Sequence, residues 1–435
     1  MPKTTAPPAD RSIAIIGLGY VGLPLAVSLA EAGCQVRGLD IWAQRVGEIN
    51  AGHSPIEDIS SRRVSDLVSS GALRATEPRA GALSGAEVVF VCVPTPTTSD
   101  HVPDLGPVMS AASFIGSELQ AGMLVVLQST TYPGTTNGPF RAALESASGL
   151  RAGIDFDLAF APERINPGDP ASAGPAIPRL VGGTSPEATA RTVRLFSLIN
   201  HQVLGLSSAE AAEAAKLLEN TFRLINISFI NEFARMCEHI GLDAWEVIDA
   251  AATKPFGFMR FTPGPGVGGH CIPVDPHYLA WRARDSGFSE RFISLAAAIN
   301  DEQPRHIVDL AVAELARRGS ILAGRRVLLA GASFKPNVSD TRNSPSSAVA
   351  SILRGFRAQV AYSDPRVGSF RDNEGQPVPA FPLSEGLDWA DLVIVMVNHD
   401  DFDWDLIYAG DRPIIDAVGS SRGRPGSAVR LGDGT

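Results

Sequence analysis

Cysteine is scarce in this 435-residue chain, which contains only four. Cys34, Cys92, Cys237 and Cys271 lie far apart in the sequence and form no Cys-x-x-Cys pair. This spacing argues against a disulfide framework and against a structural zinc site. We therefore expect a cytoplasmic protein with reduced thiols and no bound metal.

Long apolar runs are also missing. No segment approaches the roughly 18–20 consecutive apolar residues that a membrane-spanning helix requires. Residues 1–8 do not have the apolar centre of a secretory signal, and the Pro/Ala-rich residues 1–10 predict disorder. These features predict a soluble protein without a membrane partner.

Positive charge is in deficit, because 37 Lys and Arg face 47 Asp and Glu, for a net charge of −10. A negatively charged protein repels polyanions, so we expect neither nucleic acid nor an anionic membrane as a partner. Anionic ligands would have to be bound by local Lys, Arg and helix N-termini. The length predicts two or three domains.

The first part of the chain alternates between short apolar runs and helical patterns, which is typical of a doubly wound parallel sheet. After residue 206 a long helical pattern begins, with Ser207 as N-cap and Glu210 completing a capping box, and continues to His239. A second α/β pattern starts at Arg325. The predicted strands are residues 12–16, 35–40, 87–93, 123–128, 156–161, 327–330, 359–363, 392–397 and 413–416, with a helix over 20–32, a surface loop over 368–376 and mobile residues from about 419.

These patterns predict three domains. Two Rossmann-like doubly wound parallel-sheet domains, residues 1–206 and 306–435, are joined by a central helical domain, residues 207–305, with one long helix. The apolar faces of that helix suit a homodimer or larger homo-oligomer, and a plain buried core helix is an equally good interpretation.

A glycine-rich turn follows the first predicted strand, with the sequence Gly17-Leu18-Gly19-Tyr20-Val21-Gly22. Glycines at this spacing permit a tight turn and close approach of the backbone to a pyrophosphate at a helix N-terminus. Asp40 ends the next strand, where a carboxylate accepts hydrogen bonds from ribose hydroxyls and repels a 2′-phosphate. We therefore predict an NAD site and not an NADP site; the alternative is a turn in which glycine serves packing alone.

Three further residues are candidates for the cofactor site. Arg45 either covers the adenine edge or is a solvated helix residue. Thr95 and Thr130 follow the ends of later strands, at the carboxyl edge where ligands of such sheets bind.

Cys271 ends a glycine-rich segment, residues 263–270. Glycines cost chain entropy, and we expect them to bring the backbone close to a ligand. This irregular context predicts a nucleophile, whereas the other cysteines lie in helix or strand patterns typical of buried packing. A zinc role for His270 and Cys271 has no partner ligands at suitable spacing.

A thiolate beside a nicotinamide allows an alcohol to be oxidised to an acid. The thiolate adds to the intermediate aldehyde, and the adduct loses a second hydride to become a thioester that water hydrolyses. Such a site needs a cation for the oxyanion and a carboxylate to activate water. Candidates are Lys216 and Asn220, at i and i+4 on the long helix, and the carboxylates Asp275 and Glu163. By spacing alone, Lys216 is more simply a solvated residue.

At these positions the chain resembles the nucleotide-sugar 6-dehydrogenase family, which includes the UDP-glucose and UDP-N-acetylhexosamine dehydrogenases. The resemblance runs in order over nearly the whole chain. The matching segments are Gly17–Gly22, Thr95-Pro96, Ser129–Gly134, Pro162-Glu163-Arg164, Lys216–Asn220, the Cys271 loop with Asp275, Phe334-Lys335-Pro336-Asn337 and Asp340-Thr341-Arg342.

The resemblance implies roles for these residues. Cys271 is the thioester nucleophile, Lys216 and Asn220 stabilise the oxyanion, and Asp275 and Thr130 serve proton transfer. Glu163 assists hydrolysis, and Arg342 reaches towards NAD. The C-terminal domain binds the UDP moiety. The residues implied in substrate binding are Glu163, Arg164, Lys216, Asn220, Arg260, Gly268 and Lys335, although for Arg260 contact with sugar, with diphosphate or with neither stays open.

The loop Val-Gly-Gly-His-Cys-Ile-Pro-Val-Asp and Arg164 after Glu163 resemble the N-acetylhexosamine branch more than the UDP-glucose enzymes. Residues 253–259, 277–279 and 291–293 are most similar to UDP-N-acetylglucosamine 6-dehydrogenases. The predicted function is therefore NAD-dependent four-electron oxidation of a UDP-N-acetylhexosamine to its uronic acid, as used in polysaccharide biosynthesis. UDP-N-acetylmannosamine and then UDP-glucose are the alternative substrates.

Two other classes of protein are considered. A two-electron hydroxyacid-type reductase needs neither the Cys271 loop nor a second sheet. A non-enzymatic sensor of NAD and nucleotide sugar would tolerate loss of Cys271, Lys216 or the glycine fingerprint, and all three are present.

Overall fold

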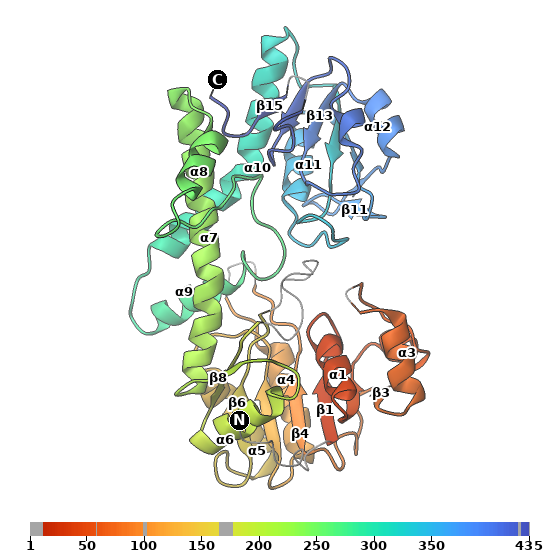
Figure 1. Ribbon diagram of the computed structural model, residues 1–435, viewed down its shortest axis with the longest axis vertical. Coiled ribbons are helices and arrows are strands. Elements are labelled where there is room, and N and C mark those ends of the chain that lie inside the picture. Colours follow the sequence, from red (N-terminus) through yellow and green to blue (C-terminus); the bar gives the residue numbers. More distant parts are fainter. Residues whose placement is uncertain (1–11, 58, 99–101, 165–176, 425–427, 435) are drawn as a thin grey trace. The chain divides into compact units, whose positions relative to one another are not determined.

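The computed structural model describes residues 12–57, 59–98, 102–164, 177–424 and 428–434, so the disorder predicted for residues 1–10 lies outside it. The chain forms two compact units (Figure 1). The first unit contains the chain up to Glu219 together with His277–Gly287, and the second contains Asn220–Pro276 and the chain from Phe288. In the described part of the chain, every helix is too short or too polar to cross a membrane.

The first unit is built on an eight-stranded sheet with the order β3-β2-β1-β4-β5-β6-β7-β8. Neighbouring strands from β3 to β6 pair in parallel, β7 runs antiparallel to β6, and β8 pairs in parallel with β7. The first six positions have the strand order of a dinucleotide-binding fold. The strands are β1 (Ser12–Ile16), β2 (Gln35–Leu39), β3 (Leu73–Thr76), β4 (Val88–Val91), β5 (Leu124–Leu127), β6 (Asp157–Phe160), β7 (Arg179–Gly183) and β8 (Val203–Gly205).

Both faces of this sheet are buried. Ile13 and Ile15 belong to one apolar cluster, whereas Ala14 and Ile16 belong to another, because successive side chains of a strand point to opposite faces. This two-sided burial explains why the strands are continuously apolar. The helices of the unit are α1 (Gly22–Glu31), α2 (Ala43–Asn50), α3 (Ser61–Ser69), α4 (Gly106–Glu118), α5 (Arg141–Ser148) and α6 (Pro186–Phe196), with a π-helical turn η1 (Thr136–Phe140).

The long helix is α7 (Ala209–Ile240), which continues from the first unit into the second (Figure 1). Its N-cap is Ser208, whose Oγ accepts a hydrogen bond from the amide of Ala211 at 3.1 Å. The predicted capping box with Ser207 is therefore wrong by one residue, and Glu210 is the second residue of the helix. The other central helices are α8 (Ala244–Ala252), α9 (Asp275–Asp285) and α10 (Phe292–Arg317).

The second unit contains a five-stranded parallel sheet with the order β10-β9-β13-β14-β15. Alternate residues of β9 again enter two apolar clusters, Val327 and Leu329 on one face and Leu328 and Ala330 on the other. The strands are β9 (Arg326–Ala330), β10 (Gln359–Ser363), β13 (Leu392–Val395), β14 (Ile414–Asp416) and β15 (Val429–Arg430), and the helices are α11 (Pro345–Gly355), α12 (Leu383–Trp389) and α13 (Trp404–Ile407).

Two sequence predictions are corrected in this unit. The segment 368–376 is mostly exposed, as predicted for a surface loop, but it contains the two-residue strand β11 (Phe370–Arg371), which pairs with β12 (Pro377–Val378) and buries Phe370. The segment from about residue 419 was predicted to be mobile, yet β15 extends the sheet and Leu431 is fully buried. The Trp245 indole also donates to the Leu431 carbonyl at 2.8 Å, which ties the C-terminal segment to α8.

Candidate active site

The glycine-rich turn lies between β1 and α1. Gly17 has a φ of +90°, and a Cβ on Gly22 would lie 1.8 Å from the Gly17 carbonyl oxygen. These two glycines are therefore required by the packing of the turn itself. A Cβ on Gly19 would meet no atom within 4 Å, so this part of the turn is open to a ligand. Tyr20 and Val21 precede the first turn of α1, where amide groups favour an anion.

Asp40 is buried directly after β2. Its Oδ2 accepts a hydrogen bond from the Leu18 amide at 2.8 Å and its Oδ1 accepts one from the Trp42 amide at 3.0 Å. Arg45 forms an ion pair with this carboxylate, since its Nη1 lies 2.9 Å from Asp40 Oδ2. Beside the carboxylate, the side chains of Ile41 and Trp42 are 78% and 63% exposed. They offer an apolar surface for a flat base, a feature that the sequence pattern did not single out.

Helix α9 holds the two loops that carry Thr95 and Thr130. The buried Tyr278 hydroxyl lies 3.0 Å from the carbonyl oxygens of Thr95 and of Pro96, to which it donates. In the second loop, the Tyr132 ring packs against Trp281 with a centroid distance of 4.6 Å. The contacts of Tyr278 and Trp281 therefore anchor loops at the carboxyl edge of the sheet, although neither residue was predicted from sequence.

Glu213 is a buried carboxylate one turn before Lys216 on α7. It accepts hydrogen bonds from the Gly134 amide at 2.6 Å, the Thr136 amide at 2.8 Å and the Thr136 hydroxyl at 2.6 Å. Burial raises the pKa of Glu213 to about 7 although these donors oppose the shift. The residue connects α7 to the segment that follows Thr130.

The raised pKa of Glu213 predicts a pH-dependent stability. The folded protein holds this proton more tightly than the unfolded chain, whose ordinary pKa is 4.5. The contribution is complete below pH 4.5 and is lost as the pH rises through about 7. We expect the free energy of unfolding to fall by at most roughly 3 kcal/mol over this range. Urea denaturation between about pH 5 and 8 measures this decrease. In Glu213→Gln the part of the pH dependence due to Glu213 should vanish. The same pH dependence of the unfolding free energy in variant and wild type would contradict the role of Glu213.

Lys216 is buried on α7, and in the part of the chain that the structure describes no carboxylate forms an ion pair with it. Glu163 lies 2.9 Å from Arg179, and Arg164 forms two hydrogen bonds with Glu219 at 2.6 and 3.2 Å. Arg164 is thus engaged by a protein carboxylate. The remainder of the predicted loop, residues 165–168, lies outside the described residues.

In the second unit, the structure brings three predicted residues together. Asn220 Nδ2 donates to Asp275 Oδ2 at 2.6 Å, and both side chains are buried. The Asp275 amide donates to the Cys271 carbonyl at 2.9 Å, which closes the loop onto the start of α9. Cys271 is exposed, whereas Cys34 and Cys237 are buried.

Two of the glycines before Cys271, Gly268 and Gly269, are tightly packed within the protein. A Cβ on Gly268 would lie 2.5 Å from the Asn343 carbonyl oxygen, and one on Gly269 would lie 2.7 Å from the Phe334 ring. At these two positions a side chain would collide with the segment from Phe334 to Asn343, so glycine is required by packing. The Asn343 amide group also donates to the Gly269 carbonyl at 2.9 Å.

The remaining candidates have partners of their own. Arg342 pairs with Asp340 at 2.6 Å, and Arg260 pairs with Asp249 at 2.8 Å. The Lys335 ammonium lies 5.7 Å from the centre of the Phe334 ring. Burial, and then the charge of Arg342, lowers the pKa of His270, which lies next to Cys271. Among the described residues, no cluster of three or more His, Cys, Asp and Glu could hold a metal ion.

Comparisons with known proteins show which family the chain resembles over most of its length. Three models of the UDP-glucose/GDP-mannose dehydrogenase family match: the NAD binding domain at residues 11–200, the central domain at 210–302 and the UDP binding domain at 328–418. The chain is 37% identical to UDP-N-acetyl-D-glucosamine 6-dehydrogenase of Pseudomonas aeruginosa, over 90% of this chain and 92% of that protein. It is 35% identical to UDP-N-acetyl-D-mannosamine dehydrogenase of Pyrococcus horikoshii, over 91% and 92%.

The fold is also similar to a solved structure. The UDP-D-ManNAc dehydrogenase of Pyrococcus horikoshii superimposes with a TM-score of 0.88 at 32% identity, over 97% of this chain and 99% of that one. Two α/β domains joined by a helical domain are therefore the architecture of both proteins.

Proposed function

Because the chain belongs to the UDP-glucose/GDP-mannose dehydrogenase family, we propose that it oxidises the C6 alcohol of UDP-N-acetylglucosamine to the uronic acid. The chain is an NAD-dependent nucleotide-sugar dehydrogenase, and the open Gly19 turn and Asp40 fit that cofactor. When bound at this turn, NAD would supply the hydride acceptor that the two oxidation steps require. The observation that carries the proposed chemistry is the exposed Cys271 beside the buried Asn220–Asp275 pair.

The choice of sugar rests on the sequence of the Cys271 loop and its neighbours. The N-acetylglucosamine and N-acetylmannosamine enzymes are 37% and 35% identical to this chain, a difference too small to separate them. UDP-N-acetylmannosamine is therefore the second candidate, and UDP-glucose the third.

Cys271 provides the covalent step in our proposal. Its thiolate sulfur bonds to C6 of the aldehyde left by the first oxidation, and the resulting thiohemiacetal loses a second hydride to become a thioester. Water then cleaves the carbon–sulfur bond, which releases the carboxylate and restores the thiol. Lys216 and Asn220 stabilise the oxyanion, Asp275 and Thr130 move protons, and Glu163 assists hydrolysis.

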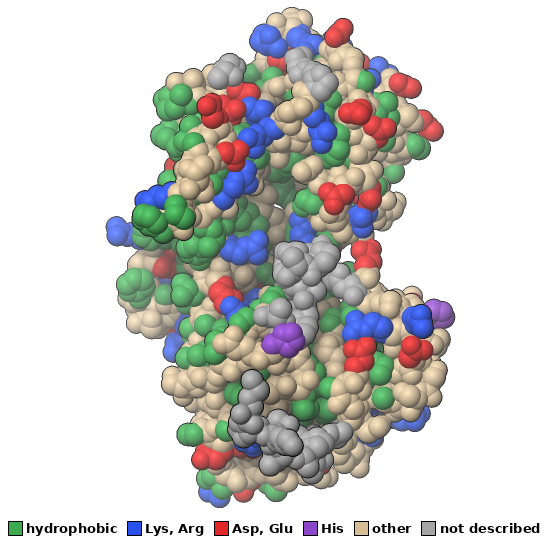
Figure 2. Space-filling model, in the orientation of Figure 1, with side chains coloured by type: hydrophobic (Ala, Val, Ile, Leu, Met, Phe, Trp, Pro, Cys, Tyr) green, Lys and Arg blue, Asp and Glu red, His purple; other side chains and the backbone are tan. Residues whose placement is uncertain are grey.

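We also propose three domains, residues 1–206, 207–305 and 306–435, and a homodimer formed through α7. Phe222, Phe229 and Met236 recur every seven residues on α7, followed by Ile240, and their side chains are 45–58% exposed. This spacing aligns them on one helix face, and a contiguous apolar stripe is typical of a subunit interface. Figure 2 shows hydrophobic side chains along the surface that α7 occupies in Figure 1.

The stoichiometry of the reaction tests the function. With NAD and a panel of UDP-hexoses, we expect about two NADH per sugar consumed and a uronic acid as product. UDP-N-acetylglucosamine should give the highest kcat/KM. One NADH per sugar, with an aldehyde or ketone as the final product, would instead identify a two-electron dehydrogenase.

A further inference from the structure

The turn that follows β9 in the second sheet resembles the glycine-rich turn that follows β1 in the first sheet. Asp364 directly follows β10 as Asp40 follows β2, and its Oδ2 accepts a hydrogen bond from the Ala332 amide at 2.7 Å. The corresponding bond from Leu18 to Asp40 measures 2.8 Å. Gly331 has a φ of +103° and Gly17 one of +90°. In both turns, a carboxylate therefore accepts a hydrogen bond from the backbone that follows β1 or β9.

The carboxylate of Asp364 is occupied by the protein. Its Oδ1 accepts hydrogen bonds from the Arg366 and Val367 amides at 2.8 and 3.1 Å. Its Oδ2 also lies 3.1 Å from His399 Nε2, and both side chains of this pair are fully buried. Asp364 is therefore engaged in holding its own turn and His399.

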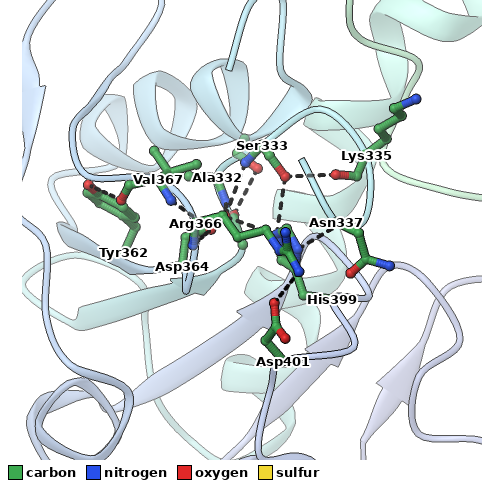
Figure 3. Close-up of polar contacts among 12 residues, drawn as sticks. Ala332, Ser333, Lys335, Asn337, Tyr362, Asp364, Arg366, Val367, His399 and Asp401 are labelled. Atoms are coloured by element: carbon green, nitrogen blue, oxygen red, sulfur yellow. Dashed lines mark hydrogen bonds and ion pairs between the residues drawn. The ribbon is translucent and has the colours of Figure 1, made fainter. Parts of the chain in front are cut away.

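The contacts of His399 define its tautomer (Figure 3). The Asn337 amide donates to Nδ1 at 3.1 Å, so Nδ1 carries a lone pair and the proton is on Nε2. Nε2 then faces Asp364 and also Ser333 Oγ, at 3.2 Å. The Ser333 hydroxyl in turn donates to the Lys335 carbonyl at 2.8 Å. A neutral, buried imidazole thus holds the chain on both sides of Lys335.

The C-terminal end of this loop, at Asn337, is also hydrogen-bonded to Asp400. Asn337 adopts a positive φ of 63°, and its Nδ2 donates to Asp400 Oδ2 at 2.8 Å. The Asp400 amide donates back to Asn337 Oδ1 at 3.1 Å. Figure 3 shows the Lys335 side chain directed away from the buried cluster, while its backbone carbonyl faces Ser333. The segment from Ser333 to Asn337 is therefore held at its backbone and leaves the Lys335 ammonium outside the cluster.

We propose that His399 is a positioning residue for UDP binding. By bonding Asn337 through Nδ1 and Ser333 through Nε2, it holds the backbone of Lys335 in place before the ligand arrives. A preorganised ammonium binds the anionic UDP moiety with less loss of chain entropy than a mobile one. This inference rests on the proposed function, in which Lys335 contacts UDP.

Binding of UDP and of NAD to the full-length protein, measured separately by calorimetry, tests the role. His399→Gln keeps a donor towards Asp364 but loses the acceptor for the Asn337 amide. We expect its affinity for UDP to fall by about 5- to 20-fold, the effect of one or two lost hydrogen bonds, with NAD affinity unchanged. KM for the UDP-sugar should rise in parallel, while kcat changes less than about 3-fold.

Two variants separate positioning from general loss of structure. His399→Asn retains an acceptor at the Nδ1 position and should recover most of the UDP affinity. Ser333→Ala removes the hydroxyl that bonds both the Lys335 carbonyl and His399 Nε2, and should weaken UDP binding by about 3- to 10-fold. The matched control is His306→Gln, because His306 Nε2 lies 2.9 Å from Glu238 in the same unit and has no contact with the Lys335 loop among its described partners. UDP affinity should be unchanged in this control.

The outcomes are distinct. Wild-type affinity for UDP in both His399→Gln and Ser333→Ala would overturn the inference while leaving the proposed function intact. Equal losses of UDP and NAD affinity would also overturn it, since they indicate a general structural role. A wild-type protein that does not bind UDP would contradict the proposed function itself.

Discussion

Replacing Cys271 by serine should abolish formation of the uronic acid and lower turnover on the order of 10⁴-fold or more, as expected when a covalent nucleophile is removed. A serine hydroxyl has a much higher pKa than a thiol, so far less of it is ionised and able to attack the aldehyde. Without the thiohemiacetal, the second hydride transfer has no suitable donor. Product analysis by mass spectrometry, together with NADH formation, measures both effects.

A matched control for this experiment is Cys237→Ala, because Cys237 is buried in a small apolar cluster on α7. Its kcat per folded molecule should match that of the wild type. Uronic acid production by Cys271→Ser at the native rate would contradict the nucleophile assignment.

Replacing Lys216 by methionine should lower kcat by about 10²- to 10³-fold, the effect of removing one group that stabilises an oxyanion. A buried ammonium is costly in free energy unless it is paired, and Lys216 has no carboxylate partner among the described residues. Methionine preserves the length and volume of the side chain without the charge. We therefore expect the melting temperature to stay the same or to rise while activity is lost.

Lys254→Met is the control for this change. Lys254 is exposed, and its ammonium lies 4.8 Å from the centre of the Phe256 ring. We expect the Lys254→Met variant to have the kcat of the wild type. A Lys216→Met variant that keeps normal kcat would show that the buried ammonium has a purely structural role.

The fold was predictable where the pattern is local. β1 and β10 were predicted to the residue, and the other strands predicted as apolar runs were placed within one or two residues. The strands β3, β7, β8, β11, β12 and β15 were missed, and β8 illustrates one reason: it has three residues, of which Leu204 and Gly205 are exposed. Its apolar run of two residues is too short to predict a strand, and β8 forms because β7 provides a pairing partner.

The active-site residues divide in the same way. Cys271 and the Gly17–Gly22 turn stand out because unusual composition is concentrated within a few positions. Glu213, Tyr278 and His399 had no such signal, since the groups they bond lie 77, 183 and 62 residues away in the sequence. Each is an ordinary residue in its own segment and acquires a role from a distant backbone amide or carbonyl.

The order of most helices and strands, the glycine turn and the proposal of Cys271 as nucleophile follow from local composition and periodicity, because these features depend on neighbouring residues. The burial of the C-terminal segment, the packing of Gly268 and Gly269 against Phe334 and Asn343, and the tautomer of His399 depend on contacts between distant segments. Hydrogen bonds and close packing between distant segments form only when the chain is folded, so these properties became readable from the folded molecule.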